Sequence, residues 1–149
     1  MRICVDSGFL IGLCNAKDQH HSNAADRFSD LFETNRHTLV VPWPILYETI
    51  RTGTVRDRNA MSQFERLWNF MARWSLLELV SDSPYREGVI DACFAELGKP
   101  ENRRRSLSAV DRVIRNILAD EAMKIDGFLT FNTRDFVDVC RKFNRRLIS

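Results

Sequence analysis

Four carboxylic acids lie beside short apolar segments of this sequence, and their type and placement could do chemistry. Asp6 follows the run ICV, while Glu48, Asp111 and Asp135 lie within ILYETI, SAVDRVI and NTRDFV. Ionising a carboxyl group at the edge of a hydrophobic core costs several kcal/mol unless it has partners. We therefore expect each acid either to cap a helix or to bind something.

Each acid also has an ordinary structural interpretation, and the sequence leaves these alternatives open. Asp6 could accept hydrogen bonds at the N-terminus of a helix that begins at the next residue. Asp111 completes an S-x-x-D pattern with Ser108 that resembles a capping box, and Asp135 could cap the helix of FVDVCRKF. Glu48 is the hardest to explain in this way, because it lies within an apolar helix with no cap to fill.

One cation site would explain the four acids together. Clustered carboxylates repel one another, and some must take up protons unless a cation lies between them. Asp and Glu without His or Cys match the ligands that Mg²⁺ or Mn²⁺ prefers, and such ions activate water against a phosphodiester. The sequence gives little support for catalysis by a histidine acid-base pair, because His20 and His21 begin a polar helix and His37 precedes a strand. We expect all three histidines at the surface.

Other catalytic motifs are missing from the sequence. The six glycines form neither a G-x-G-x-x-G motif nor a P-loop. A phosphotransferase with Asp6 as nucleophile would favour a D-x-D signature, but Ser7 and Gly8 follow Asp6. The cysteines contain no C-x-x-C, so neither a zinc site nor a disulfide framework is indicated. We expect reduced core thiols at Cys4, Cys14, Cys93 and Cys140.

The composition is that of a globular protein in the cytoplasm. The 149 residues are 44% hydrophobic and 28% charged, which fits a single domain over 1–149. No apolar run approaches the ~20 residues that cross a bilayer, and Asp6 interrupts the only segment that imitates a secretion signal. The net charge is +2 at pH 7, yet 18 of the 22 basic residues are arginine. Arginine suits phosphate binding, although codon bias explains the same excess.

Apolar periodicity alternates strands with helices along the whole chain. Expected strands cover 2–6, 37–42, 75–81, 126–132 and 145–149, and expected helices cover 7–16, 21–34, 42–53, 57–73, 84–97, 108–123 and 135–143. Such alternation implies parallel pairing through right-handed crossovers. It predicts an α/β fold, a three-layer α/β/α sandwich with a central parallel sheet of four to five strands. Ligands collect beyond the carboxyl ends of such strands, where the four acids would meet.

Four segments resemble, in order, the successive motifs of PIN-domain ribonucleases, especially the toxin half of VapBC-type toxin-antitoxin pairs. They are ICVDSGFLIGL, PWPILYETIR, SAVDRVIRNILA and GFLTFNTRDF, which together span nearly the whole chain. The resemblance is most specific at Asp6-Ser7 and in the pattern Thr130-x-Asn132-x-x-Asp135. It implies a parallel α/β/α fold in which an acidic cluster holds Mg²⁺ or Mn²⁺ and hydrolyses RNA.

The resemblance carries over to individual positions. Asp6, Glu48 and Asp111 fall on the three regular acids of the family, and Asp135 falls on its less regular fourth. Some members carry an acid where this chain has Asn132. Groups that support the ligands or orient the phosphate would be Ser7, Thr130 and Asn132.

The leading hypothesis is a metal-dependent endoribonuclease of the VapC type. Asp6, Glu48 and Asp111 would anchor the first metal, and Asp135 would position the attacking water or a second ion. Basic residues would guide the RNA backbone through contacts that weaken with salt, namely Arg103, Arg104, Arg105 and Arg134.

The resemblance further implies a cognate antitoxin and a homodimer. One of Trp43, Trp68 and Trp74 could lie in a symmetric interface, although all three could equally belong to the core. The alternative function is a non-catalytic PIN-like module that binds RNA or a partner protein, and the presence of all four acids favours the enzyme.

Overall fold

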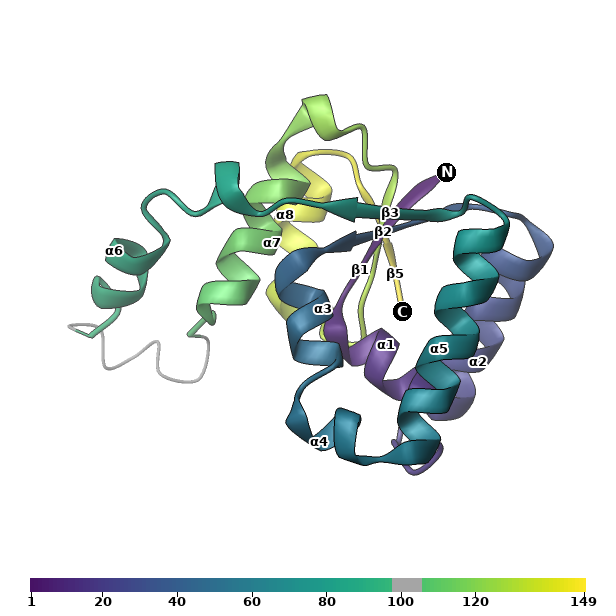
Figure 1. Ribbon diagram of the computed structural model, residues 1–149. Helices are drawn as coiled ribbons and strands as arrows, with labels where there is room; N and C mark the ends of the chain where they lie inside the picture. Colours follow the sequence, from purple (N-terminus) through teal and green to yellow (C-terminus); the bar gives the residue numbers. More distant parts are fainter. Residues whose placement is uncertain (98–105) are drawn as a thin grey trace.

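A five-stranded parallel sheet forms the centre of the protein. The computed structural model describes residues 1–97 and 106–149. Within these residues the strand order is β3-β2-β1-β4-β5, and every neighbouring pair is parallel. The strands are β1 (Arg2–Val5), β2 (Thr38–Pro42), β3 (Leu77–Val80), β4 (Gly127–Leu129) and β5 (Arg146–Ile148) (Figure 1). The predicted parallel α/β fold is therefore confirmed.

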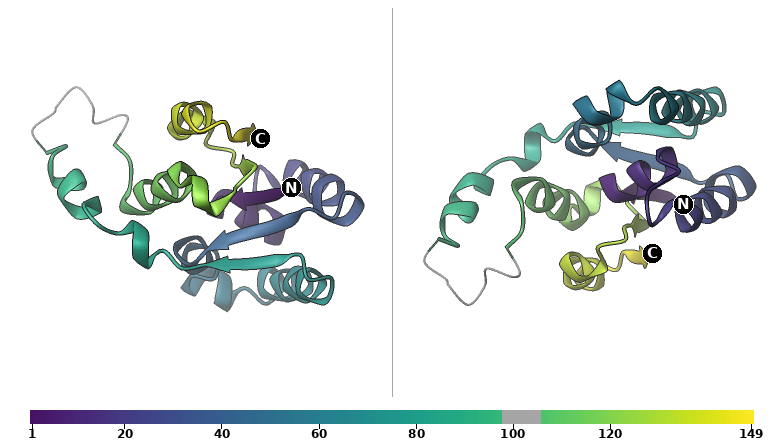
Figure 2. Two further views of the ribbon diagram at one scale, coloured as in Figure 1. Left: turned by 90° about the horizontal axis from the view of Figure 1, so that it is seen from above. Right: turned by 90° about the horizontal axis from the view of Figure 1, so that it is seen from below.

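Helices cover both faces of this sheet. The first group packs together on one side, as Figures 1 and 2 show, and comprises α1 (Ser7–Cys14), α2 (His21–Phe28) and α5 (Arg58–Arg73), with α3 (Trp43–Thr49) beside α1 and α4 (Thr52–Arg56) beside α5. The second group comprises α6 (Val89–Phe94), α7 (Ala109–Ala119) and α8 (Val137–Lys142), in which α7 contacts both of the others. The result is the expected three-layer α/β/α arrangement.

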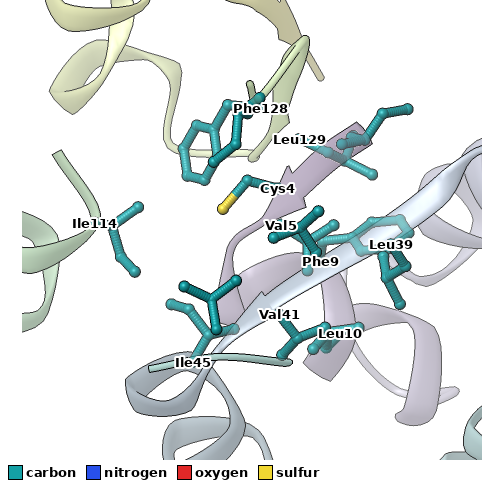
Figure 3. Packing of buried hydrophobic residues seen from close by; sticks show 14 of the residues in the cluster. Cys4, Val5, Phe9, Leu10, Leu39, Val41, Ile45, Ile114, Phe128 and Leu129 are labelled. Carbon is teal, nitrogen blue, oxygen red and sulfur yellow. The ribbon is translucent and has the colours of Figure 1, made fainter. Parts of the chain in front are cut away.

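The core lies on both faces of the central strand β1. Ile3, Cys4 and Val5 are fully buried, which explains the uninterrupted apolar run, because a central parallel strand is covered on both sides. Figure 3 shows the Cys4 side chain directed toward Ile114 and Phe128. The core-thiol prediction is confirmed for Cys4, Cys14 and Cys140, whereas the free thiol of Cys93 is only half-buried.

The connections diverge between β1 and β4, which is the point of a parallel sheet where α/β proteins have a ligand-binding crevice. The chain leaves β1 toward β2, whereas it leaves β4 toward β5 at the opposite edge. Such a switch point opens a space beyond the carboxyl ends of the two strands. Asp6 and Thr130 follow these two strands, and the Asp6 amide donates to the Leu129 carbonyl at 3.0 Å.

The predicted helices 42–53 and 84–97 have different bounds in the structure, because single residues in them do not adopt the α-helical conformation. The segment 42–53 divides into α3 and α4, since Arg51 is extended (φ −61°, ψ 167°), and Gly53 lies inside α4 rather than ending a helix. The predicted helix 84–97 begins with a 3₁₀ turn over Ser83–Tyr85, and its α-helix starts only at Val89, because Gly88 adopts a left-handed conformation at φ 72°. No helix in the described part of the chain is long and apolar enough to span a membrane.

Candidate active site

Asp6 is placed at the junction of β1 and α1. Its Oδ1 accepts the Ser7 amide at 2.7 Å, so the capping interpretation of this acid is confirmed. Its Oδ2 accepts the Thr130 hydroxyl, also at 2.7 Å. The two bonds fix the orientation of the carboxyl group between the ends of β1 and β4.

The pKa of Asp6 is set first by burial, then by two hydrogen bonds, and least by the neighbouring acids. Burial raises the pKa of Asp6, the hydrogen bonds from Thr130 and Ser7 lower it, and the charges of Asp111 and Glu48 raise it again. The balance leaves the pKa above its ordinary value. Glu48 on α3 and Asp111 on α7 are therefore close enough to Asp6 to act on its charge.

Asp111 combines its place near Asp6 with a capping role at the start of α7. Its amide donates to Ser108 Oγ at 3.0 Å, and its Oδ2 accepts the Ser108 amide at 2.9 Å. The predicted capping box is confirmed. Among the described residues this box occupies only Oδ2 of Asp111, so the cap does not use both oxygens of the carboxylate.

Asp135 is held differently from the other acids. It ends a 3₁₀ turn over Thr133–Asp135, and its Oδ2 accepts the side-chain amide of Asn132 at 2.6 Å. The suggestion that Asp135 caps the last helix is wrong, because Phe136 is the N-cap residue of α8 and the helix has no side-chain cap.

Hydrogen bonds connect Asp135 to Asp6 through two intervening residues. Thr130 is fully buried. Its hydroxyl donates to Asp6 and accepts the Asn132 amide at 2.9 Å, and Asn132 in turn donates to Asp135. The order Asp6-Thr130-Asn132-Asp135 thus spans the crevice between the two strands.

The comparisons with known proteins bear on this fold. The chain matches no protein-family model, and no curated protein sequence matches it. Its structure is similar to that of VapC20 from Mycobacterium tuberculosis, a toxin that cleaves the sarcin-ricin loop, with a TM-score of 0.59 and 16% sequence identity. The match covers 91% of this chain and 94% of that one. The chain has the fold of a PIN-domain toxin.

The acids of this PIN fold have the oxygen donors that a hard cation prefers, but among the described residues they do not form a complete metal site. Asp6, Glu48 and Asp111 offer only oxygen donors. Burial is the main cause of the raised pKa of Asp6, and a cation would relieve the smaller contribution from the charges of Asp111 and Glu48. Nevertheless, no three His, Cys, Asp or Glu side chains in residues 1–97 and 106–149 are placed to hold one ion. The donor set fits Mg²⁺ or Mn²⁺, while the side-chain positions would have to adjust.

The structure describes only one of the four basic residues that are predicted to contact RNA. Arg103, Arg104 and Arg105 lie outside the described residues. Arg134 is exposed, and with Asp135 it lines an open pocket of about 500 Å³. One of the predicted basic residues is therefore placed beside a predicted site acid.

Two predictions about ring-bearing residues need correction. His20, His21 and His37 are all half-buried rather than on the surface. The His20 ring stacks on Phe131 with centroids 4.4 Å apart, and His21 Nδ1 lies 2.8 Å from the Gly12 carbonyl oxygen. Among the tryptophans, Trp68 packs against the core, whereas two are exposed, Trp43 at 37% and Trp74 at 52%.

Arg115 contacts the candidate site, and the sequence did not indicate this. This residue lies on α7 one turn after Asp111, and its guanidinium contacts the backbone carbonyl of Asp135 and the carboxylate of Asp138. An arginine on a helix is usually a solvated surface residue, and nothing local in the sequence indicates a contact with a segment twenty positions away.

Proposed function

We propose that this protein is a metal-dependent endoribonuclease of the VapC toxin type, which hydrolyses RNA phosphodiester bonds. The observation that carries the proposal is the Asp6 carboxyl, which Ser7 and Thr130 hold at the switch point of the sheet near the charges of Glu48 and Asp111. Such a cluster is costly without a cation, and oxygen-only acids suit Mg²⁺ or Mn²⁺. The structural similarity to an RNA-cleaving toxin supports the same conclusion.

The acids on the β1, α3 and α7 side would bind the metal ion. Asp6, Glu48 and Asp111 would hold the ion, and Thr130 and Ser7 would keep the Asp6 carboxyl aimed at it. When bound, the ion supplies an activated water and neutralises charge on the phosphate.

The residues on the β4 side would orient the reactants. Asp135 would accept a hydrogen bond from the attacking water or help to hold a second ion, and Asn132 keeps its carboxylate in place. Arg134, and the basic run 103–105, would contact the RNA backbone. The charge of an exposed arginine beside Asp135 suits a phosphate next to the one that is cleaved.

The toxin interpretation includes specific partners. RNA is the proposed substrate, a small antitoxin protein is the proposed inhibitor, and the enzyme would act in the cytoplasm as a homodimer. The exposed Trp43 on α3 and Trp74 after α5 provide apolar surface for protein contacts, since aromatic residues are enriched at interfaces.

The second candidate function is a PIN-like module that binds RNA or a protein without cutting. It is favoured by one observation, that no three acids of the described residues are placed to share an ion. The two functions differ in what Mg²⁺ or Mn²⁺ does, because a binding module would retain RNA without shortening it.

Cleavage of labelled structured RNA separates these functions. We expect products in Mg²⁺ or Mn²⁺, none in excess chelator, and none with Asp6→Ala. Asp57→Ala is the matched control, because Asp57 is also an aspartate N-cap, accepting the Asn59 and Ala60 amides, but it caps a different helix, α5. Uncut RNA under all metal conditions, or cleavage that survives Asp6→Ala, would contradict the proposal.

A further inference from the structure

Arg115 connects the helix that carries Asp111 to the turn that carries Asp135. Its Nη1 donates to the backbone carbonyl of Asp135. Its Nη1 and Nη2 also donate to the two carboxylate oxygens of Asp138, at 2.7 and 2.6 Å. A bidentate pair of this kind holds the guanidinium plane in one orientation, so the contact with Asp135 is directed rather than incidental.

Stability alone is a weak explanation for this arrangement. The Asp138 side chain is 66% exposed, although that of Arg115 is only 23% exposed. Ion pairs open to solvent contribute little to folding, because water screens them. What distinguishes Arg115 is the contact with one particular backbone carbonyl at the edge of the candidate site.

The segment that carries Asp135 depends on its neighbours for its position. Strand β4 is short, and the turn Thr133–Asp135 is a single 3₁₀ turn. The bond from Asn132 to the Asp135 carboxylate lies within the same loop, so it cannot fix the loop against α7. On the other side, Thr130 links the loop to Asp6.

Arg115 therefore completes a continuous connection around the crevice. From Asp6 the contacts pass through Thr130 and Asn132 to Asp135. From Asp135 they pass through Arg115 to α7, which carries Asp111 one turn earlier. Among the described residues, the hydrogen bonds that join α7 to the turn Thr133–Asp135 come from Arg115.

We propose that Arg115 is a positioning residue, which fixes Asp135 relative to Asp111 and so sets the rate of the cleavage step. The proposal rests on the proposed nuclease function. Substrate binding along the RNA backbone does not need this tie, whereas the alignment of the attacking water does. A displacement of about 1 Å can cost ~10²-fold in rate, so we expect kcat to fall roughly 10- to 100-fold without Arg115, with KM nearly unchanged.

Arg145, which lies between α8 and β5, offers a matched control because it contacts the other end of α7. Its Nε donates to the Leu118 carbonyl at 3.0 Å and its Nη2 to the Asp120 carbonyl at 3.2 Å. It therefore also ties α7 to another segment through backbone carbonyls, but at the end of α7 away from Asp111. Arg145→Met should lower the melting temperature while leaving kcat near the wild-type value.

The experiment compares Arg115→Met, Arg115→Lys and Arg145→Met in the full chain. Steady-state cleavage of RNA gives kcat and KM, and hydrogen exchange reports the order of the turn through the Phe136 amide, which donates to the Thr133 carbonyl at 3.2 Å. We expect Arg115→Met to lower kcat and to speed exchange at this amide. Arg115→Lys should recover part of both, because an ammonium group can reach the carbonyl but cannot form the fork.

Each of the two measurements, hydrogen exchange and steady-state cleavage, has a result that would overturn the proposal. Exchange at Phe136 that is as slow in Arg115→Met as in Arg145→Met would show that Arg115 does not order the turn. Equal losses of kcat in the two Met variants would show a general effect of stability. Failure of the nuclease function is distinguishable, because it appears in the wild type as uncut RNA, while hydrogen exchange still decides the positioning role.

Discussion

Replacing Thr130 with valine should destabilise the protein strongly for so small a change. The side chain is fully buried, its hydroxyl donates to Asp6 Oδ2 at 2.7 Å, and it accepts the Asn132 amide at 2.9 Å. Valine has the same shape but can neither donate a hydrogen bond to Asp6 nor accept one from Asn132. Losing a hydrogen bond to a charged group costs about 1.5–3 kcal/mol, and losing a neutral one about 0.5–1.5 kcal/mol. We therefore expect a total loss of roughly 2–4 kcal/mol in the free energy of unfolding at neutral pH.

The loss should depend on pH in a defined direction. Burial, the largest influence, raises the pKa of Asp6 above its unfolded value. Asp6 therefore favours folding most when it is protonated, below its unfolded pKa, and this contribution is lost as the pH rises through the folded pKa. The Thr130 hydrogen bond opposes this effect because it stabilises the ionised carboxylate. Thr130→Val should raise the pKa of Asp6 further, so its cost should be greater at neutral pH than in acid.

Urea unfolding of the metal-free protein, with chelator present, measures these effects. Thr130→Ser is the control, because it keeps the hydroxyl and removes only a methyl group, at a cost of about 1 kcal/mol. Three results would refute the reasoning about this hydrogen bond. They are a Thr130→Val protein within about 0.5 kcal/mol of wild type at neutral pH, an equal loss in Thr130→Ser, or a greater loss in acid.

Two further predictions concern the metal and self-association. Mn²⁺ at 100 times its dissociation constant should stabilise the wild type by about 2.7 kcal/mol, and a calorimetric scan should show this shift abolished in Asp111→Asn. Ser108→Ala should lower stability by about 1 kcal/mol yet keep the Mn²⁺ shift, whereas a wild type without a shift would contradict the metal site. Light scattering should give a mass above the 17.4 kDa of one chain, because Trp43 and Trp74 expose apolar surface. A constant mass of 17.4 kDa over a wide concentration range would exclude the dimer.

The fold was predictable because its central elements have strong local patterns. The run Ile3-Cys4-Val5 is apolar without alternation, which is typical of a strand covered on both faces, and it forms the buried central strand β1. The S-x-x-D pattern at Ser108 correctly predicted the start of α7. Helix ends were harder to predict from the sequence, because they depend on single backbone conformations such as the left-handed Gly88.

The candidate site was only partly predictable, because some of its contacts connect distant segments. Asp6 stood out because an acid ends an apolar run, and its bond to Thr130 follows from the pairing of β1 with β4. The half-burial of His20 follows from stacking on Phe131, which lies more than a hundred positions away. The contact of Arg115 with the Asp135 carbonyl arises only when α7 and the turn before α8 lie side by side. A single sequence carries no local signal for such pairs.

The chemistry of the RNA ends tests the central claim most directly. If a carboxylate-held ion activates water, the attacking oxygen comes from solvent, so the products carry 5′-phosphate and 3′-hydroxyl ends. Ligation-based mapping of the termini, with Mg²⁺ or Mn²⁺ and with chelator, identifies these ends. We predict 5′-phosphate and 3′-hydroxyl ends that disappear in chelator and with Asp6→Ala, Glu48→Ala or Asp111→Ala. Cyclic phosphate ends, or cleavage that persists in chelator, would show that these acids do not act through a metal.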